Sequence, residues 1–196
     1  MNTSVFSTYL EVGFEHILDL QAYDHLVFLL AMAAIYTLPD WRKVLLLVTS
    51  FTIGHSITLA LSTFNIIRFN TALIEFLIPV TILITAVANF FKLKGGAKKQ
   101  PLLLSVHNLL AIGFGLIHGM GFSNYLKMLL GKSQSVALEL FAFNVGIELA
   151  QIVIVLCLLL LNFLLLRLFK LKQRDWIMVL SSIAGGIALL LILQQL

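Results

Sequence analysis

Long hydrophobic runs separated by short polar segments dominate the chain. From residue 23 onward, six runs lie at about 23–38, 44–64, 71–91, 102–123, 136–168 and 175–194. Most are close to the roughly 20 residues that a helix needs to cross a bilayer core, and the fifth is long enough that it must tilt, kink or extend beyond the membrane. The pattern predicts an all-α membrane protein with six transmembrane helices in one polytopic domain, residues 1–196.

Residues 4–20 follow a different pattern. Apolar side chains recur there at helical spacing, whereas Glu11, Glu15 and Asp19 recur every fourth residue. This arrangement is typical of an amphipathic helix at a membrane interface. We therefore expect an interfacial helix before the first span.

Composition supports the membrane assignment. Hydrophobic residues make up 60% of the chain and charged residues 11%, with a mean hydropathy of +1.03, whereas soluble domains carry about 25% charged residues. The net charge of +4 does not indicate nucleic-acid binding, because Lys and Arg fall between the hydrophobic runs and form no basic stripe. The single cysteine, Cys157, excludes an internal disulfide and a cysteine-based metal cluster.

Basic residues also predict orientation. Ten of the 13 Lys and Arg residues lie in the loops after spans one, three and five, and the other three are Arg68, Lys127 and Lys132. The positive-inside rule places the ten in the cytoplasm, with both termini outward. The expected location is the inner (cytoplasmic) membrane of the cell, with the lipid bilayer as the main partner.

Ionisable residues inside the hydrophobic runs are the candidate functional residues, because each costs at least a few kcal/mol in lipid. Asp24 and His25 stand together at the head of the first span. The later spans carry His55, Glu75, His118 and Glu148. At 1.5 Å per residue, Asp24, His25, His55 and His118 fall at roughly 16–24 Å above the inner edge of the core. Any one of them could serve only to hydrogen-bond a neighbouring helix, but the set together predicts a shared site in the outer half.

Other polar residues could line a pathway or orient the ligands. His107 precedes His118 by eleven residues on the same face, about 16 Å away, so the two cannot bind one ion. Asn144, Glu148 and Gln151 share one face of the fifth span. The candidates for these roles are His107, Asn144, Gln151 and Ser56.

Imidazole and carboxylate ligands together suit Ni²⁺, Co²⁺, Zn²⁺, Cu²⁺ or Fe²⁺, and the lack of thiolates argues against Cu(I). Neighbouring helical residues point about 100° apart, so Asp24 and His25 cannot both face one ion on a regular helix. One could bind the metal while the other orients a ligand on an adjacent helix. Gly115 and Gly119 have the spacing that allows two helices to pack closely.

Four motifs resemble those of the HupE/UreJ family. They are GFEHIL at 13–18 with DHLVFLL at 24–30, FTIGHSITL at 51–59, FGLIHGMGF at 114–122 and FNVGIELAQ at 143–151. The resemblance implies a small membrane protein that supplies metal, with Ni²⁺ favoured and Zn²⁺ or Co²⁺ as alternatives. Partners would be metalloenzyme-maturation proteins, those of hydrogenase or urease, or a second copy in a homo-oligomer.

The resemblance also implies a metal-handling set, in which Glu75 matches only by its span. The set is His16, Asp24, His25, His55, Glu75, His118 and Glu148. His16 precedes Asp24 by eight residues, more than in the family pattern, and the usual Pro or Gly between them is missing. A looped entry to the first span would bring His16 over the site.

Three functions are compatible with these residues. The favoured one is binding and transport of a divalent transition metal through the outer-half site. The second is a zinc-dependent intramembrane hydrolase or transferase, in which three protein ligands and a water suffice and Asp24 or Glu148 is the base. The third is a metal sensor or accessory protein without turnover. A continuous polar path to the inner face favours transport, whereas three ligands open to a cleft favour the enzyme.

Overall fold

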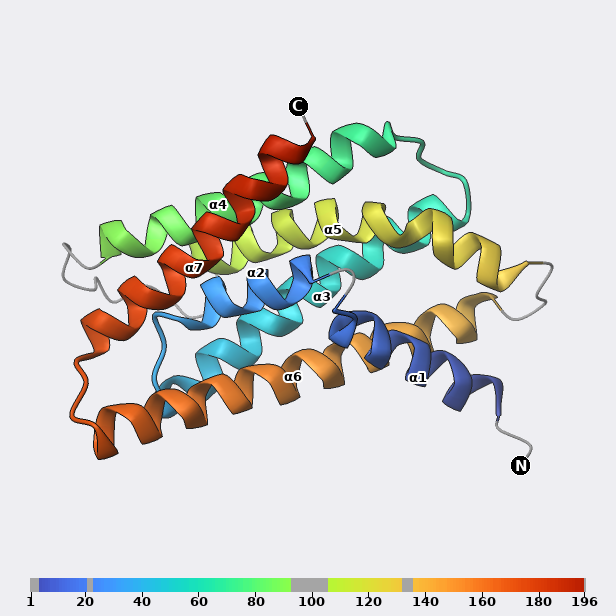
Figure 1. Ribbon diagram of the computed structural model, residues 1–196. Coiled ribbons are helices and arrows are strands. Elements are labelled where there is room, and N and C mark those ends of the chain that lie inside the picture. The colour runs from blue at the N-terminus through green and yellow to red at the C-terminus, as the bar shows by residue number, and fades with distance from the viewer. Residues whose placement is uncertain (1–3, 21–22, 93–105, 132–135, 196) are drawn as a thin grey trace.

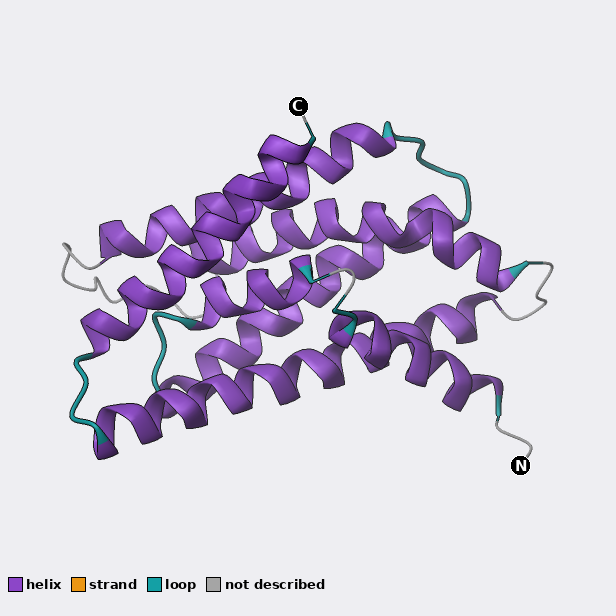
Figure 2. Cartoon of the chain, in the orientation of Figure 1, coloured by secondary structure: helices purple, strands orange, loops and turns teal. Residues whose placement is uncertain are grey.

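The computed structural model describes residues 4–20, 23–92, 106–131 and 136–195, and all regular structure in this part of the chain is helical (Figures 1 and 2). Seven α-helices and one 3₁₀ helix, η1, follow one another. Their bounds are α1 Val5–Leu18, α2 Asp24–Ala33, η1 Leu38–Asp40, α3 Trp41–Thr63, α4 Thr71–Lys92, α5 Val106–Leu130, α6 Val136–Leu168 and α7 Gln173–Gln194. The all-α prediction is confirmed.

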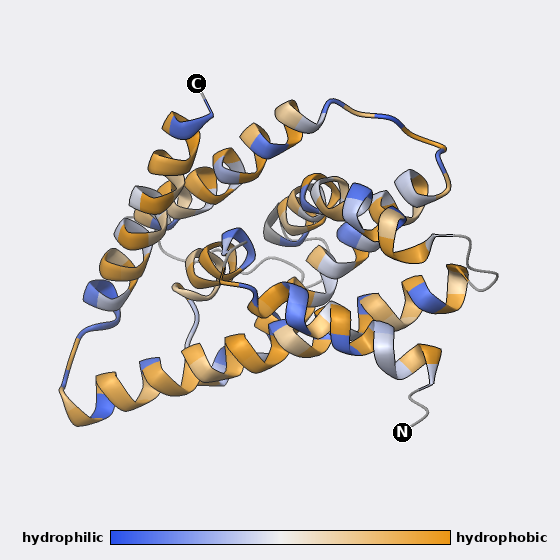
Figure 3. Ribbon diagram, turned by 45° about the vertical axis from the view of Figure 1, so that its right-hand side comes forward, coloured by the Kyte–Doolittle hydropathy of each residue, from blue (hydrophilic) through white to orange (hydrophobic). Residues whose placement is uncertain are grey.

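Within the described residues, five helices are long and apolar enough to cross a membrane, namely α3, with its η1 turn, to α7. The fifth predicted span matches α6, a continuous helix of 33 residues, and the third matches α4 to within one residue. The fourth ends later than predicted, since α5 continues from residue 123 to Leu130. Its predicted start at 102 lies outside the described residues. Hydrophobic residues predominate along these helices (Figure 3). Many of their large hydrophobic side chains are exposed, as expected of lipid-facing surfaces.

The prediction for residues 23–38 as one span is wrong. The helix here, α2, has ten residues and ends at Ala33, so it is about 15 Å long against a core of about 30 Å. Side chains from α4, α6 and α7 stabilise the early end of this helix. Side-chain amides donate to three backbone carbonyls there: Asn89 to Ala31 at 2.8 Å, Asn162 to Tyr36 at 2.9 Å and Gln173 to Ala34 at 3.3 Å. A buried helix end needs such partners, because its last carbonyls have none within the helix.

Helix α1 precedes α2 along the same neighbour, α6 (Figure 1). The backbones of α1 and α6 touch at two glycines: a Cβ at Gly13 would overlap the carbonyl oxygen of Phe143, and one at Gly146 that of Leu10. Whereas α1 contacts the first third of α6, the segment after α2 reaches Asn162 near the other end. The chain therefore passes along α6 in two helical pieces, of which the first ends at Leu18 and the second begins at Asp24.

Helix α3 is the most buried of the five long helices and packs most extensively against α5. Glycines again allow backbone contact, since a Cβ at Gly115 would overlap the carbonyl oxygen of Phe51 and one at Gly119 that of His55. This confirms the close packing expected from their spacing. Helices α1, α2, α3 and α5 therefore meet around one point in the interior.

Candidate metal centre

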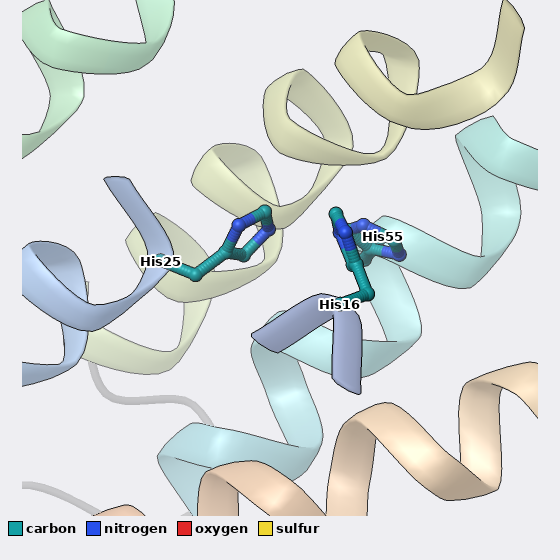
Figure 4. Close-up of side chains that lie close together, drawn as sticks. All are labelled: His16, His25 and His55. Atoms are coloured by element: carbon teal, nitrogen blue, oxygen red, sulfur yellow. The ribbon is translucent and has the colours of Figure 1, made fainter. Parts of the chain in front are cut away.

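Four of the five histidines lie close together in the middle of the bundle, where the end of α1 and the start of α2 meet α3 and α5. His16 comes from the last turn of α1, His25 from the first turn of α2, His55 from α3 and His118 from α5. All four are buried, with exposed fractions between 0% and 9%. Figure 4 shows His25 facing His16 and His55 across the gap between three helices.

His25 is the centre of this group, which we call the histidine layer (His16, His25, His55 and His118). Its ring centroid lies 4.7 Å from that of His16, 5.1 Å from His118 and 5.9 Å from His55. Ligand atoms of His16, His25 and His55 lie within 4.8 Å of one another, as do those of Asp24, His25 and His118. Metal–nitrogen bonds of 2.0–2.1 Å put tetrahedral ligand atoms roughly 3.3 Å apart. Small side-chain rotations would therefore close either set around an ion.

Asp24 orients His25. Its Oδ1 accepts the backbone N–H of His25 at 2.9 Å and lies 3.1 Å from His25 Nδ1. A carboxylate can only accept, so we assign the ring proton to Nδ1. Nε2 then carries the free lone pair, and this atom is buried without a hydrogen-bond partner. The sequence left open which residue would orient and which would bind; in the structure Asp24 orients its own neighbour rather than a ligand on another helix.

His118 is oriented by a residue that the sequence did not single out. The Thr81 hydroxyl donates to the Ile78 carbonyl at 2.7 Å and lies 3.2 Å from His118 Nε2. Because a hydroxyl has one proton, Thr81 must accept from Nε2–H. The lone pair of His118 is then on Nδ1, which has no hydrogen-bond partner. No spacing in the sequence links Thr81 to His118, because they meet only through the packing of α4 on α5.

His16 and His55 also have free nitrogens. His16 Nε2 and both ring nitrogens of His55 are buried without a hydrogen bond of good geometry, although Asn144 lies close enough to interact with His55. The Phe122 ring packs on His16 with centroids 3.8 Å apart, and Phe143 stacks on Phe122 at 5.1 Å. The eight-residue spacing thus does not keep His16 from the site. Buried imidazole nitrogens without well-formed hydrogen bonds are costly in an apolar interior, so this arrangement fits a bound cation.

The other candidates take separate places. Glu75 is exposed and lies with Asp24 in a cleft of about 190 Å³ beside the layer. Glu148 accepts from the Thr49 hydroxyl at 2.6 Å, and Gln151 pairs with Thr52 at 2.9 Å. Among the described residues, neither metal-type cluster includes a glutamate.

One pathway candidate, Ser56, contributes less than expected, and the prediction for His107 stays untested. Ser56 donates to the carbonyl of Thr52 at 2.7 Å, so its hydroxyl serves its own helix. The side chain of His107 lies outside the described part of the chain.

A search of curated proteins and a search of solved structures find no match to the chain. A family model described as HupE / UreJ protein matches residues 1–195. The match includes all four motifs and every residue of the histidine layer. The chain is therefore a membrane protein of the HupE/UreJ family.

Proposed function

We propose that the protein binds a divalent transition metal in the histidine layer and carries it across the membrane, with Ni²⁺ or Co²⁺ as the cargo. The observation that carries the proposal is the convergence of His16, His25 and His55 with free, buried nitrogens. Neutral imidazoles in a dry interior suit these borderline metals. Asp24 supplies a negative charge beside the site, which lowers the cost of bringing in a dication.

The proposed topology has six crossings, with α1 and α2 together forming the first. Tyr9 on α1 bonds to the carbonyl of Leu129 near the end of α5, and Gln195 lines the cleft that holds Glu75. These contacts support termini at one end of the bundle, together with the 64–70 loop (Figure 1). Ten of the Lys and Arg residues lie in the loops at the opposite end of the bundle. By the positive-inside rule that end is cytoplasmic, so we assign the end with the termini to the outer side of the inner membrane. Broken helices at mid-membrane are a recurring feature of transporter binding sites.

In this scheme the cleft with Asp24 and Glu75 is the entry. Asp24 faces the cleft, with 24% of its side chain exposed, and holds His25, which is 5% exposed. A cation attracted by the two carboxylates would then be next to His25, which directly follows Asp24 in the chain. An inside-negative potential of 100 mV would favour entry of a dication by about 4.6 kcal/mol. On the inner side the ion would pass to maturation proteins of a metalloenzyme.

Proteoliposomes loaded with a metal-sensitive dye test this function. The expected result is Ni²⁺ or Co²⁺ uptake that accelerates with an inside-negative potential and is lost in His25→Ala. Binding of metal without flux under any imposed gradient would contradict transport.

A zinc-dependent hydrolase or transferase is the second candidate. It is favoured by a specific observation, since three converging histidines match a catalytic zinc site, in which the fourth position is free for water. His16, His25 and His55 would hold the zinc, which would activate the water. For this enzyme we expect the purified protein to retain one zinc ion per chain and proteoliposomes to show no metal flux.

A further inference from the structure

The direct way inward from the histidine layer is closed by aromatic rings. Phe28 and Phe51 stack at 4.9 Å, and their centroids lie 5.4 and 5.2 Å from His118. Phe114 meets the edge of Phe28 at 6.0 Å. Phe28 and Phe114 also line a cavity of about 70 Å³, whose walls are mainly apolar and carry no charged residue. A dication would find no charged ligand on this route.

A polar seam lies beside these rings, between α3 and α6. We define the α3–α6 seam as Thr49, Thr52, Asn144, Glu148 and Gln151. It begins at His55, with which Asn144 interacts. Thr52 and Thr49 come three and six residues before His55 on α3, towards the end of the helix opposite the cleft. The seam therefore leads away from the histidine layer and around the aromatic rings.

The seam contains oxygen atoms without donors. Glu148 Oε2 is buried and has no hydrogen-bond partner, and Asn144 Oδ1 has none of good geometry, although Asn144 interacts with His55. Gln151 is fully buried. Its Oε1 accepts from the Thr52 hydroxyl at 2.9 Å, and its Nε2 has no hydrogen-bond partner. A carbonyl oxygen has two lone pairs, so Oε1 keeps one that a cation could use.

From this arrangement we infer that the α3–α6 seam is a second, oxygen-donor station, which the divalent cation occupies after leaving the histidine layer through His55. The inference rests on the proposed function. Late first-row cations bind imidazole nitrogen tightly, and conduction requires that each step be weak enough to leave. Amide and carboxylate oxygens hold such ions less tightly, and Glu148 supplies the charge that keeps the ion in a buried place.

The test separates binding in the histidine layer from passage through the seam. In full-length protein, Co²⁺ reports on imidazole binding by its visible absorption, and flux is read in proteoliposomes with a Co²⁺-quenched dye. Glu148→Gln keeps the shape of the side chain and an acceptor for Thr49 but removes the charge. We expect Co²⁺ affinity within about twofold of the unmodified protein and flux lower by about tenfold, a barrier increase of about 1.4 kcal/mol. Glu139→Gln, the same change nine residues earlier on α6, is the matched control and should keep its flux.

Each other outcome counts against the seam. Unmodified flux in a folded Glu148→Gln protein overturns the station, and so does a large loss of Co²⁺ affinity, which would place Glu148 in the first site. Should Glu148→Gln fail to fold, Gln151→Met tests the same station through another ligand, and unmodified flux there overturns it as well. Absence of flux in the unmodified protein is a different failure, because it removes the proposed function before any variant is compared.

Discussion

The two sides of the bundle are packed in different ways. On one side, α1 meets α6 and α3 meets α5 through backbone contacts at glycines, such as Gly13 and Gly119. On the other, α4 meets α7 through side chains: a Cβ at Gly185 would lie 3.5 Å from that of Ala86, and one at Gly186 would meet nothing within 4 Å. Three of the four histidines belong to the glycine-packed helices. Backbone contact fixes the distance between two helices, so ligands on such helices are held in register with one another.

This difference also suggests which part can move. One proposed ligand, His25, lies on the short helix α2, which packs against α4 and α7 as well as α6. Side-chain contacts tolerate small shifts better than backbone contacts do. The contact between α4 and α7 is therefore of the more tolerant kind, whereas α1 with α6 and α3 with α5 are held by backbone contacts.

The largest effect is expected from breaking a backbone contact. Gly119→Val would force α3 and α5 apart, because its Cβ overlaps the His55 carbonyl oxygen. We expect a loss of at least about 3 kcal/mol, the upper part of the range for overpacking, and little monodisperse protein in detergent. Gly186→Val, on the opposite side of the bundle, has open space and should give nearly the normal yield. Equal behaviour of the two variants would remove the distinction between the sides.

The next effect is loss of the central ligand. His25→Ala removes the one residue shared by both ligand clusters, so metal affinity should fall by at least about 100-fold, more than is lost with an outer-sphere partner. His107→Ala serves as the control, because residue 107 lies about 16 Å along α5 from His118. Mass spectrometry of metal content and calorimetric titration measure both. Similar losses in the two variants would show that the histidine layer is not the site.

A smaller effect is expected from the partner of His118. Thr81→Val keeps the shape of the side chain but removes the acceptor for Nε2–H. Removing a group that orients a ligand costs about 10–100-fold in affinity, and we expect the lower end because His118 is one of several ligands. Thr85→Val, one turn further along α4, removes only a hydroxyl bonded to its own helix and should bind normally. Titration with Ni²⁺ or Co²⁺ decides between them.

The smallest effect is expected at the contact between α4 and α7, which is made by side chains. Gly185→Ala adds a methyl group at an ordinary contact distance from Ala86 and replaces glycine with a better helix former. The free energy of unfolding should stay the same or rise by up to about 1 kcal/mol. A thermal melt in detergent measures it. A clear destabilisation would mean that α4 and α7 are as tightly packed as α3 and α5.

Sequence alone determined much of this protein. Hydrophobic runs of about 20 residues located α3 to α7, because a membrane-spanning helix must bury its own backbone polar groups and expose apolar side chains along its whole length. The cost of an ionisable group in lipid singled out Asp24, His25, His55 and His118. Basic residues in alternate loops predicted the orientation, which stays a prediction. Each of these features depends on residues close together in the chain, so the sequence alone shows it.

Only the tertiary structure decided where the first pass breaks and which residues meet there. Residues 23–38 are hydrophobic enough to suggest one helix. In the structure, side-chain amides of Asn89, Gln173 and Asn162 bond carbonyls in and just after the end of α2, at Ala31, Ala34 and Tyr36, and so stabilise its early end. Because α1 and α2 are separate helices, His16 in the last turn of α1 can pack against His25, with ring centroids 4.7 Å apart. Neither the three amides nor Thr81 has a sequence signal, because each is defined by a partner between 37 and 139 residues away. Hydropathy records the preference of a segment for lipid, whereas a buried hydrogen bond depends on which helices pack together.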